Sequence, residues 1–221
     1  MIFNVIFDVD GTIWNSTNLC AKAWRRAVEE TGYSKVEVTG EMLQKEFGLP
    51  MNVIADHVFT DLDDQEKKDE LLKLCCKYEQ EILHDNTEDI SYKGIVEAIK
   101  KLSEEYQLFI VSNCQKGYIE LVMKKLGIYC EITGHLCFGE TGYPLKGQTL
   151  QALKNHWMLS GDCVYIGDTL GDKEAAEYAR CKFIYAAYGF GDLQGEKYVV
   201  NSPAEIAEQI IEINNDMRYG R

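Results

Sequence analysis

Acidic side chains follow the first apolar run of this sequence. Asp8 and Asp10 come directly after residues 1–7, in which only Asn4 is polar, and Gly11 comes next. Two acids one residue apart share a face of a strand while the extended geometry lasts, and a glycine then permits a turn closed to other residues. Open α/β sheets bind their ligands at the carboxyl ends of strands. The stretch 5–12 therefore predicts a ligand site at the end of a central strand.

Later parts of the chain repeat this arrangement. Each further polar group ends an expected strand or lies in the loop after one: Ser112 with Asn113, Lys146, and Asp168 with Asp172. Each group alone also fits a local role, such as a turn, a helix cap or a solvated loop charge. If the strands are neighbours, however, all of these groups meet Asp8 and Asp10 in one crevice. Their joint occurrence favours an active site.

Residues 90–221 alternate between apolar runs and amphipathic segments. Besides the first strand, strands are expected at 108–111, 135–138, 163–166, 182–186 and 198–200. Helices are expected at 95–102, 119–126, 147–157, 172–179 and from 203 onward. Apolar strands that alternate with helices indicate a doubly wound parallel sheet with right-handed crossovers, which is a Rossmann-like α/β core.

Residues 15–89 carry only helical patterns. The expected helices are 16–31, 41–47, 52–59 and 64–83. In the last of them Leu71, Cys75 and Tyr78 recur at helical spacing, as a buried face requires. The sequence thus predicts an α/β core formed by residues 1–14 and 90–221, with an all-helical cap domain formed by residues 15–89 inserted into it.

The charge balance restricts the partners. The 221 residues include 36 acidic and 23 basic side chains, a formal net charge of −13. This balance argues against nucleic acid or an anionic membrane as the main partner. An anionic substrate would need a cation or a focused basic site. The eight cysteines form no CxxC pair, and we find no secretory signal or long apolar span, so we expect reduced thiols in a cytoplasmic protein.

Four motifs, in this order, resemble those of the haloacid dehalogenase superfamily. They are the segments 7–12, 111–113, 146–147 and 167–172. The likeness covers essentially the whole chain, and the subgroup resembled is the phosphoglycolate phosphatase-like hydrolases with a helical cap between the first and second motifs. The resemblance implies a Mg²⁺-dependent hydrolase of phosphomonoesters whose substrate is a small phosphorylated metabolite.

The resemblance also implies roles for the acids. Asp8 would attack phosphorus and form an aspartyl-phosphate, an established use of a carboxylate. Asp10 would protonate the leaving alcohol and then activate the water that cleaves the intermediate. Asp8, the main-chain carbonyl of Asp10 and Asp168 would hold Mg²⁺. Dehalogenases of the superfamily lack the second acid, so Asp10 favours a phosphorus substrate over a carbon–halogen one.

Three residues would bind the phosphoryl oxygens on the same grounds: Ser112, Asn113 and Lys146. Asp172 would lie behind them and orient metal-bound water or Lys146. Asn15 stands where many relatives carry an acidic residue, near the hinge to the cap. This departure leaves the substrate preference open more than the core chemistry.

Two other functions remain open at this stage. A phosphomutase of the same superfamily would retain the phosphoryl group and return it to its substrate. A signalling module would accept a phosphoryl group on Asp8 without turnover, although receiver domains lack a helical insertion of this size. The sequence does not decide between a monomer and a dimer.

Overall fold

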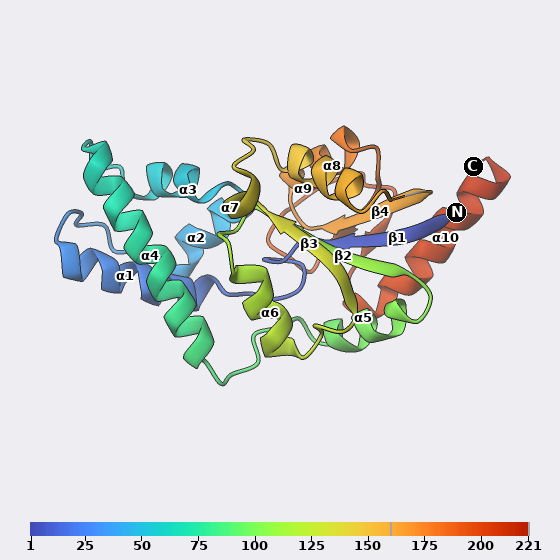
Figure 1. Cartoon of the computed structure of the whole chain (residues 1–221), viewed down its shortest axis with the longest axis horizontal. Coiled ribbons are helices and arrows are strands. Elements are labelled where there is room, and N and C mark those ends of the chain that lie inside the picture. Colours follow the sequence, from blue (N-terminus) through green and yellow to red (C-terminus); the bar gives the residue numbers. More distant parts are fainter. Residues whose placement is uncertain (160, 221) are drawn as a thin grey trace. The chain divides into compact units, whose positions relative to one another are not determined.

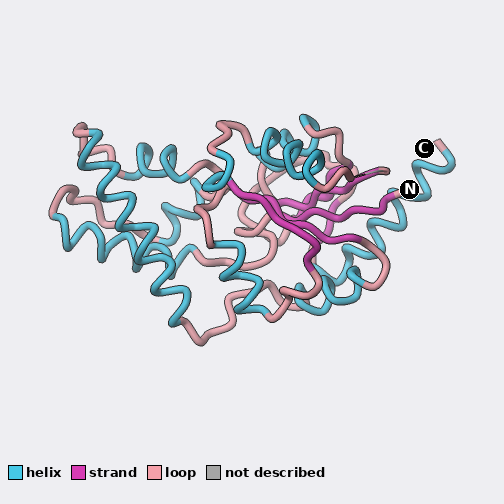
Figure 2. Tube along the Cα trace, in the orientation of Figure 1, coloured by secondary structure: helices cyan, strands magenta, loops and turns pink. Residues whose placement is uncertain are grey.

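The computed structural model describes residues 1–159 and 161–220. The chain divides into two compact units, one formed by Met1–Trp14 with Ser91–Arg221 and the other by Asn15–Ile90. Figure 2 shows the strands of the sheet in the first of these units. Over the described residues, every helix is too short or too polar to cross a lipid bilayer.

A six-stranded parallel sheet forms the centre of the first unit, in the order β3-β2-β1-β4-β5-β6. The strands are β1 (Ile2–Phe7), β2 (Gln107–Ser112), β3 (Ile132–Cys137), β4 (Asp162–Gly167), β5 (Lys182–Ala186) and β6 (Val199–Val200). Phe7 lies opposite Ile110 of β2 and Ile166 of β4, so the carboxyl ends of the three central strands are level. The predicted α/β fold class is confirmed.

Helices cover both faces of the sheet (Figure 1). One layer consists of α8 (Lys146–His156) and α9 (Leu170–Tyr178), and the opposite layer contains α5 (Ile95–Ser103) and α10 (Ile206–Tyr219). The remaining helices of the unit are α6 (Tyr118–Leu126), α7 (Phe138–Thr141) and the short 3₁₀ helix Pro203–Glu205.

Side chains alternate between the two faces of the sheet, and this alternation places Asp8 on the face covered by α8 and α9. Ile6, Phe109 and Tyr165 pack against α8 and α9 in one buried cluster. Because side chains alternate, Asp8, two residues after Ile6, points to the same layer as long as the strand geometry continues. Asp8 therefore faces the layer formed by α8 and α9.

Three local predictions differ from the structure. The strand expected at 135–138 begins earlier, at Ile132, because its pairing with β2 starts there although its edge position leaves it only partly buried. Lys146, expected in a loop, is the first residue of α8. The apolar run of residues 1–7 predicts a strand buried on both faces, but Phe3, close to the start of β1, is 55% exposed.

The second unit contains α1 (Thr17–Thr31), α2 (Gly40–Glu46), α3 (Met51–Val58) and α4 (Gln65–Asp85). Its core joins α1 to α4. Trp24 of α1 is fully buried, stacks on Phe59 with ring centroids 5.4 Å apart, and donates its indole N–H to Glu79 at 2.5 Å. Glu79 is itself only 2% exposed, so the hydrogen bond is shielded from water.

Two glutamates of α4 provide a matched test of this packing. Glu79→Ala leaves the Trp24 N–H without its acceptor, and we expect it to lower the free energy of unfolding by about 2 kcal/mol. Glu81→Ala removes the same atoms from an exposed pair with Arg26, and we expect a change within about 0.5 kcal/mol. Urea unfolding followed by far-UV circular dichroism measures both. Equal losses in the two variants would contradict a special role for the buried hydrogen bond.

Candidate active site

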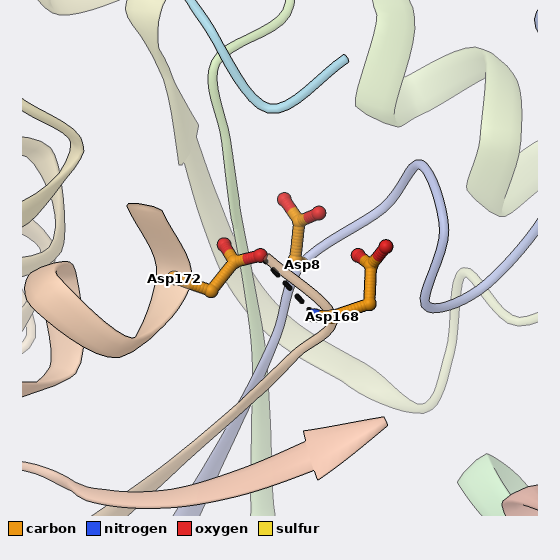
Figure 3. A group of neighbouring side chains, drawn as sticks. All are labelled: Asp8, Asp168 and Asp172. Atoms are coloured by element: carbon orange, nitrogen blue, oxygen red, sulfur yellow. Dashed lines mark hydrogen bonds between the residues drawn. The ribbon is translucent and has the colours of Figure 1, made fainter. Parts of the chain in front are cut away.

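Three buried carboxylates meet at the carboxyl ends of β1 and β4. Asp8 follows β1, Asp168 follows β4, and Asp172 lies in the first turn of α9. One oxygen of each lies within 4.8 Å of the others, and the three residues are 2%, 0% and 0% exposed (Figure 3). In this strand order the sheet extends through β2 and β3 on one side of the β1/β4 pair and through β5 and β6 on the other. Such a topological switch point is where open α/β sheets bind ligands.

Lys146 joins two of the three carboxylates. Its Nζ lies 2.6 Å from Asp8 Oδ1 and 2.5 Å from Asp172 Oδ1, and the residue is 6% exposed. The first turn of a helix disfavours a cation, so the helix itself does not account for this position. Burial opposes the charge, but the carboxylates of Asp172 and Asp8 more than compensate and raise the pKa of Lys146. The lysine is held as a buried ammonium.

Asp172 is saturated with hydrogen-bond donors. Its Oδ1 accepts from Lys146 and from the Tyr165 hydroxyl at 3.3 Å. Its Oδ2 accepts from the backbone N–H of Asp168 at 3.2 Å, and from the backbone N–H and hydroxyl of Thr169 at 2.9 and 2.7 Å. These donors use the about four lone-pair sites of a carboxylate. Asp172 is therefore suited to orient Lys146.

The local sequence explains why Asp172 has this position. Thr169 is the N-cap of α9, and its hydroxyl accepts from the backbone N–H of Asp172 while Asp172 accepts from Thr169, a reciprocal capping box. Burial alone would raise the pKa of Asp172, but the Lys146 ammonium and the Thr169 donors hold it below the usual value. The carboxylate of Asp172 thus caps helix α9 and also contacts Lys146.

Asp168 is held by backbone that approaches it unusually closely. Its Oδ2 accepts from the backbone N–H of Phe190 at 2.7 Å and its Oδ1 from the Thr12 hydroxyl at 3.3 Å. A Cβ at Gly11, where φ is +89°, would lie 2.2 Å from Asp168 Oδ2, and one at Gly189 would lie 2.3 Å from the Gly11 carbonyl oxygen. Only glycine fits at both positions.

The charges of this cluster do not balance. Burial, reinforced by the charge of Asp172, raises the pKa of Asp168 to about 7. Burial also raises the pKa of Asp8, against the attraction of Lys146. Three carboxylates face a single ammonium, so a divalent cation would offset the excess negative charge. Mg²⁺ prefers oxygen ligands and is usually held by one or two carboxylates. The donor set therefore fits the metal that the motifs predict.

The other predicted residues lie where β1 and β2 end. Asp10 lies in the turn after β1, where its Oδ1 accepts from the Tyr118 hydroxyl at 2.8 Å and from the Trp14 indole N–H at 3.1 Å. Its side chain is not one of the three clustered carboxylates. Ser112 is the last residue of β2, the strand that pairs with β1, and Asn113 follows it; the two residues are 5% and 8% exposed.

The sequence motifs do not predict three aromatic residues that contact Asp10 or Asp172. The Tyr165 hydroxyl shares its single proton between the Val111 carbonyl at 3.0 Å and Asp172 Oδ1 at 3.3 Å. Trp14 and Tyr118 contact Asp10. Alternation within 163–166 could have placed Tyr165 on the face of Asp8, and Trp14 is only four residues from Asp10. Tyr118 carries no such signal, because 108 residues separate it from Asp10.

Comparison with known proteins agrees with this geometry. The family model for the haloacid dehalogenase-like hydrolases matches residues 5–186. The chain belongs to this family. The family predicted from the four motifs is confirmed, and the protein is an enzyme of the hydrolase class.

Individual relatives of this hydrolase are distant in sequence. A protein named phosphoglycolate phosphatase, from Aliivibrio fischeri, is 23% identical over an alignment of 218 residues that covers 93% of this chain and 92% of that protein. A crystal structure described as a predicted phosphoglycolate phosphatase from Haemophilus somnus matches with a TM-score of 0.80 and 19% identity, covering 94% of this chain and 97% of that one. The hydrolase SP0104 from Streptococcus pneumoniae matches with a TM-score of 0.78 and 20% identity, covering 95% and 98%. At these identities the structural matches support the fold alone.

Removal of the buried ammonium tests the charge arrangement. Lys146→Met leaves the carboxylates of Asp8 and Asp172 without their cation. We expect it to lower the free energy of unfolding by about 3–5 kcal/mol in the presence of a chelator. Lys173→Met, which breaks a partly exposed pair with Glu196, is the control and should have a much smaller effect. Urea unfolding of both variants in EDTA is the measurement, and an unaffected Lys146→Met would show that the carboxylates do not depend on the lysine.

Proposed function

We propose that this hydrolase is a Mg²⁺-dependent phosphomonoester phosphatase that acts on a small phosphorylated metabolite through an aspartyl-phosphate on Asp8. The observation that carries the proposal is the position of the Asp8 carboxylate, which is contacted by the buried Lys146 ammonium and lies within 4.8 Å of Asp168. A carboxylate that attacks an anionic phosphate ester needs positive charge beside it. The relative named phosphoglycolate phosphatase supports the reaction class.

The proposed reaction has two half-reactions. In the first, Asp8 forms a bond to phosphorus, the bond from phosphorus to the ester oxygen breaks, and Asp10 gives that oxygen a proton. In the second, Asp10 takes a proton from water as the water attacks phosphorus, so that inorganic phosphate leaves and Asp8 is regenerated. The two half-reactions use Asp10 in opposite protonation states, as acid–base catalysis by one residue requires.

Positive charge at the site would come from two sources. The side chains of Asp8 and Asp168, with the main-chain carbonyl of Asp10, would hold Mg²⁺, which supplies Lewis-acid stabilisation of the phosphoryl oxygens when bound. Lys146, with Ser112 and Asn113, would bind the same oxygens. Asp172 would keep Lys146 in place through the 2.5 Å contact.

The proposed location is the cytoplasm. The eight cysteines, all of which lie in the described part of the chain, form no disulfide, and most of them are buried. Disulfides persist in oxidising compartments and are rare where glutathione keeps thiols reduced. Cysteines that form no disulfide support a reducing compartment.

The nucleophile is tested by Asp8→Asn. We expect loss of phosphate release by at least about 10³-fold, because the amide is not a nucleophile toward phosphorus. The measurement is inorganic phosphate released from a panel of phosphate esters, with circular dichroism to confirm the fold. Asp192→Asn, an exposed substitution of the same kind, is the control. Unchanged turnover in Asp8→Asn would exclude this mechanism, and isomerisation without phosphate release by the wild type would indicate a mutase.

The metal is tested separately from turnover. We expect EDTA to abolish phosphate release and Mg²⁺ to restore it. Because a ligand that binds the folded state stabilises it, Mg²⁺ should also raise the unfolding temperature of the wild type. Asp168→Asn should lose this increase, whereas Asp162→Asn, at an exposed ion pair with the amino terminus, should retain it. Full activity in EDTA would contradict the proposed cofactor.

A further inference from the structure

Asp10 lies at one corner of a triangle of hydrogen bonds. The Tyr118 hydroxyl and the Trp14 indole N–H both reach Asp10 Oδ1, at 2.8 and 3.1 Å, and the same indole N–H lies 3.2 Å from the Tyr118 oxygen. We propose that Tyr118 and Trp14 are positioning residues that fix the Asp10 carboxylate and assign its proton transfer to Oδ2. This inference rests on the proposed function, because it concerns the acid–base role of Asp10.

Both donors are held rigidly. Trp14 and Tyr118 are 1% and 2% exposed, and their rings meet edge to face with centroids 5.6 Å apart at 80°. Trp14 closes the turn after β1, because its carbonyl accepts from Gly11 at 2.9 Å and its N–H donates to Val9 at 3.2 Å. Tyr118 is the first residue of α6. The two side chains come from separate elements and have little freedom to move away from Asp10.

The direction of the hydrogen bonds determines which oxygen carries the proton. An indole nitrogen is only a donor, so Trp14 shares its single proton between Asp10 Oδ1 and the Tyr118 oxygen, and the Tyr118 proton points to Asp10 Oδ1. Oδ1 thus accepts from two donors, which occupy the lone pairs of a carboxylate oxygen. A proton on this carboxyl group is carried by Oδ2. It passes from Oδ2 to the ester oxygen as the phosphorus–oxygen bond breaks, and Oδ2 later takes a proton from water.

A packing role would not require these donors. The ring of phenylalanine would fill the space of Tyr118, and its edge-to-face contact with Trp14 would survive. The hydroxyl instead contributes a contact to a carboxylate that is only partly buried and that sits beside the catalytic cluster. Tyr118→Phe therefore removes one hydrogen-bond donor and leaves the packing in place, which makes it the informative substitution.

The test is the dependence of kcat/KM on the leaving group. An alkyl phosphate such as glycerol phosphate needs a proton on its leaving oxygen, whereas p-nitrophenyl phosphate expels a stable anion. We expect Tyr118→Phe and Trp14→Phe to lower kcat/KM roughly tenfold for the alkyl ester and less than about threefold for the p-nitrophenyl ester. Phenyl phosphate should fall between them. Asp10→Asn should show the same pattern with a larger amplitude.

The controls separate this inference from a structural effect. Tyr198→Phe also removes a hydroxyl that contacts a carboxylate, Asp216 at 3.0 Å, and should leave the leaving-group dependence unchanged. Melting temperatures show whether each variant folds, and Trp14→Phe serves as the test should Tyr118→Phe not fold.

Two results would overturn the inference alone, provided that Asp10→Asn shows the expected pattern. In the first, Tyr118→Phe and Trp14→Phe lower kcat/KM equally for all esters. In the second, neither variant lowers kcat/KM for any ester. A wild type that releases no phosphate from any ester would overturn the proposed function together with the inference. A steeper leaving-group dependence in Tyr118→Phe and Trp14→Phe, absent from Tyr198→Phe, would confirm it.

Discussion

The burial of Asp8, Asp168 and Asp172 beside one lysine constrains the rest of the α/β unit. Charges removed from water are tolerated only when partners replace the lost hydration. Lys146, Tyr165, Thr169 and the Phe190 N–H provide those partners. Each comes from a different part of the chain, so the cluster exists only when β4, α8, α9 and the loop after β5 are all in place. The cost of burying the acids thereby links the geometry of the site to the folding of the unit.

The two acids of the first motif have different surroundings. Asp8 contacts an ammonium, which favours its ionised form against the burial that opposes it. Asp10 receives hydrogen bonds from two neutral donors. Carboxylates one residue apart can thus take different roles, because the environment and not the residue type separates them.

The helical unit enters the fold between β1 and α5 without interrupting the sheet. The chain leaves at Asn15 and returns at Ile90, and these two residues share a backbone hydrogen bond of 2.9 Å. Trp14 and Ser91 form an antiparallel bridge beside them. Since the ends of the insertion are paired, residues 15–90 close on themselves and fold around their own core, in which Trp24 and Glu79 lie.

The sequence alone determined the strand ends, the acids that follow them and the family, because apolar runs and short motifs are local patterns. The predicted bounds of β3 were less accurate, since an edge strand is partly exposed and its apolar residues alternate less regularly. Only the tertiary structure decided which side chains meet. Lys146 contacts Asp8 across 138 residues and Tyr118 contacts Asp10 across 108. Such contacts depend on strand order and on the packing of helices over the sheet, and no local spacing in the chain encodes either.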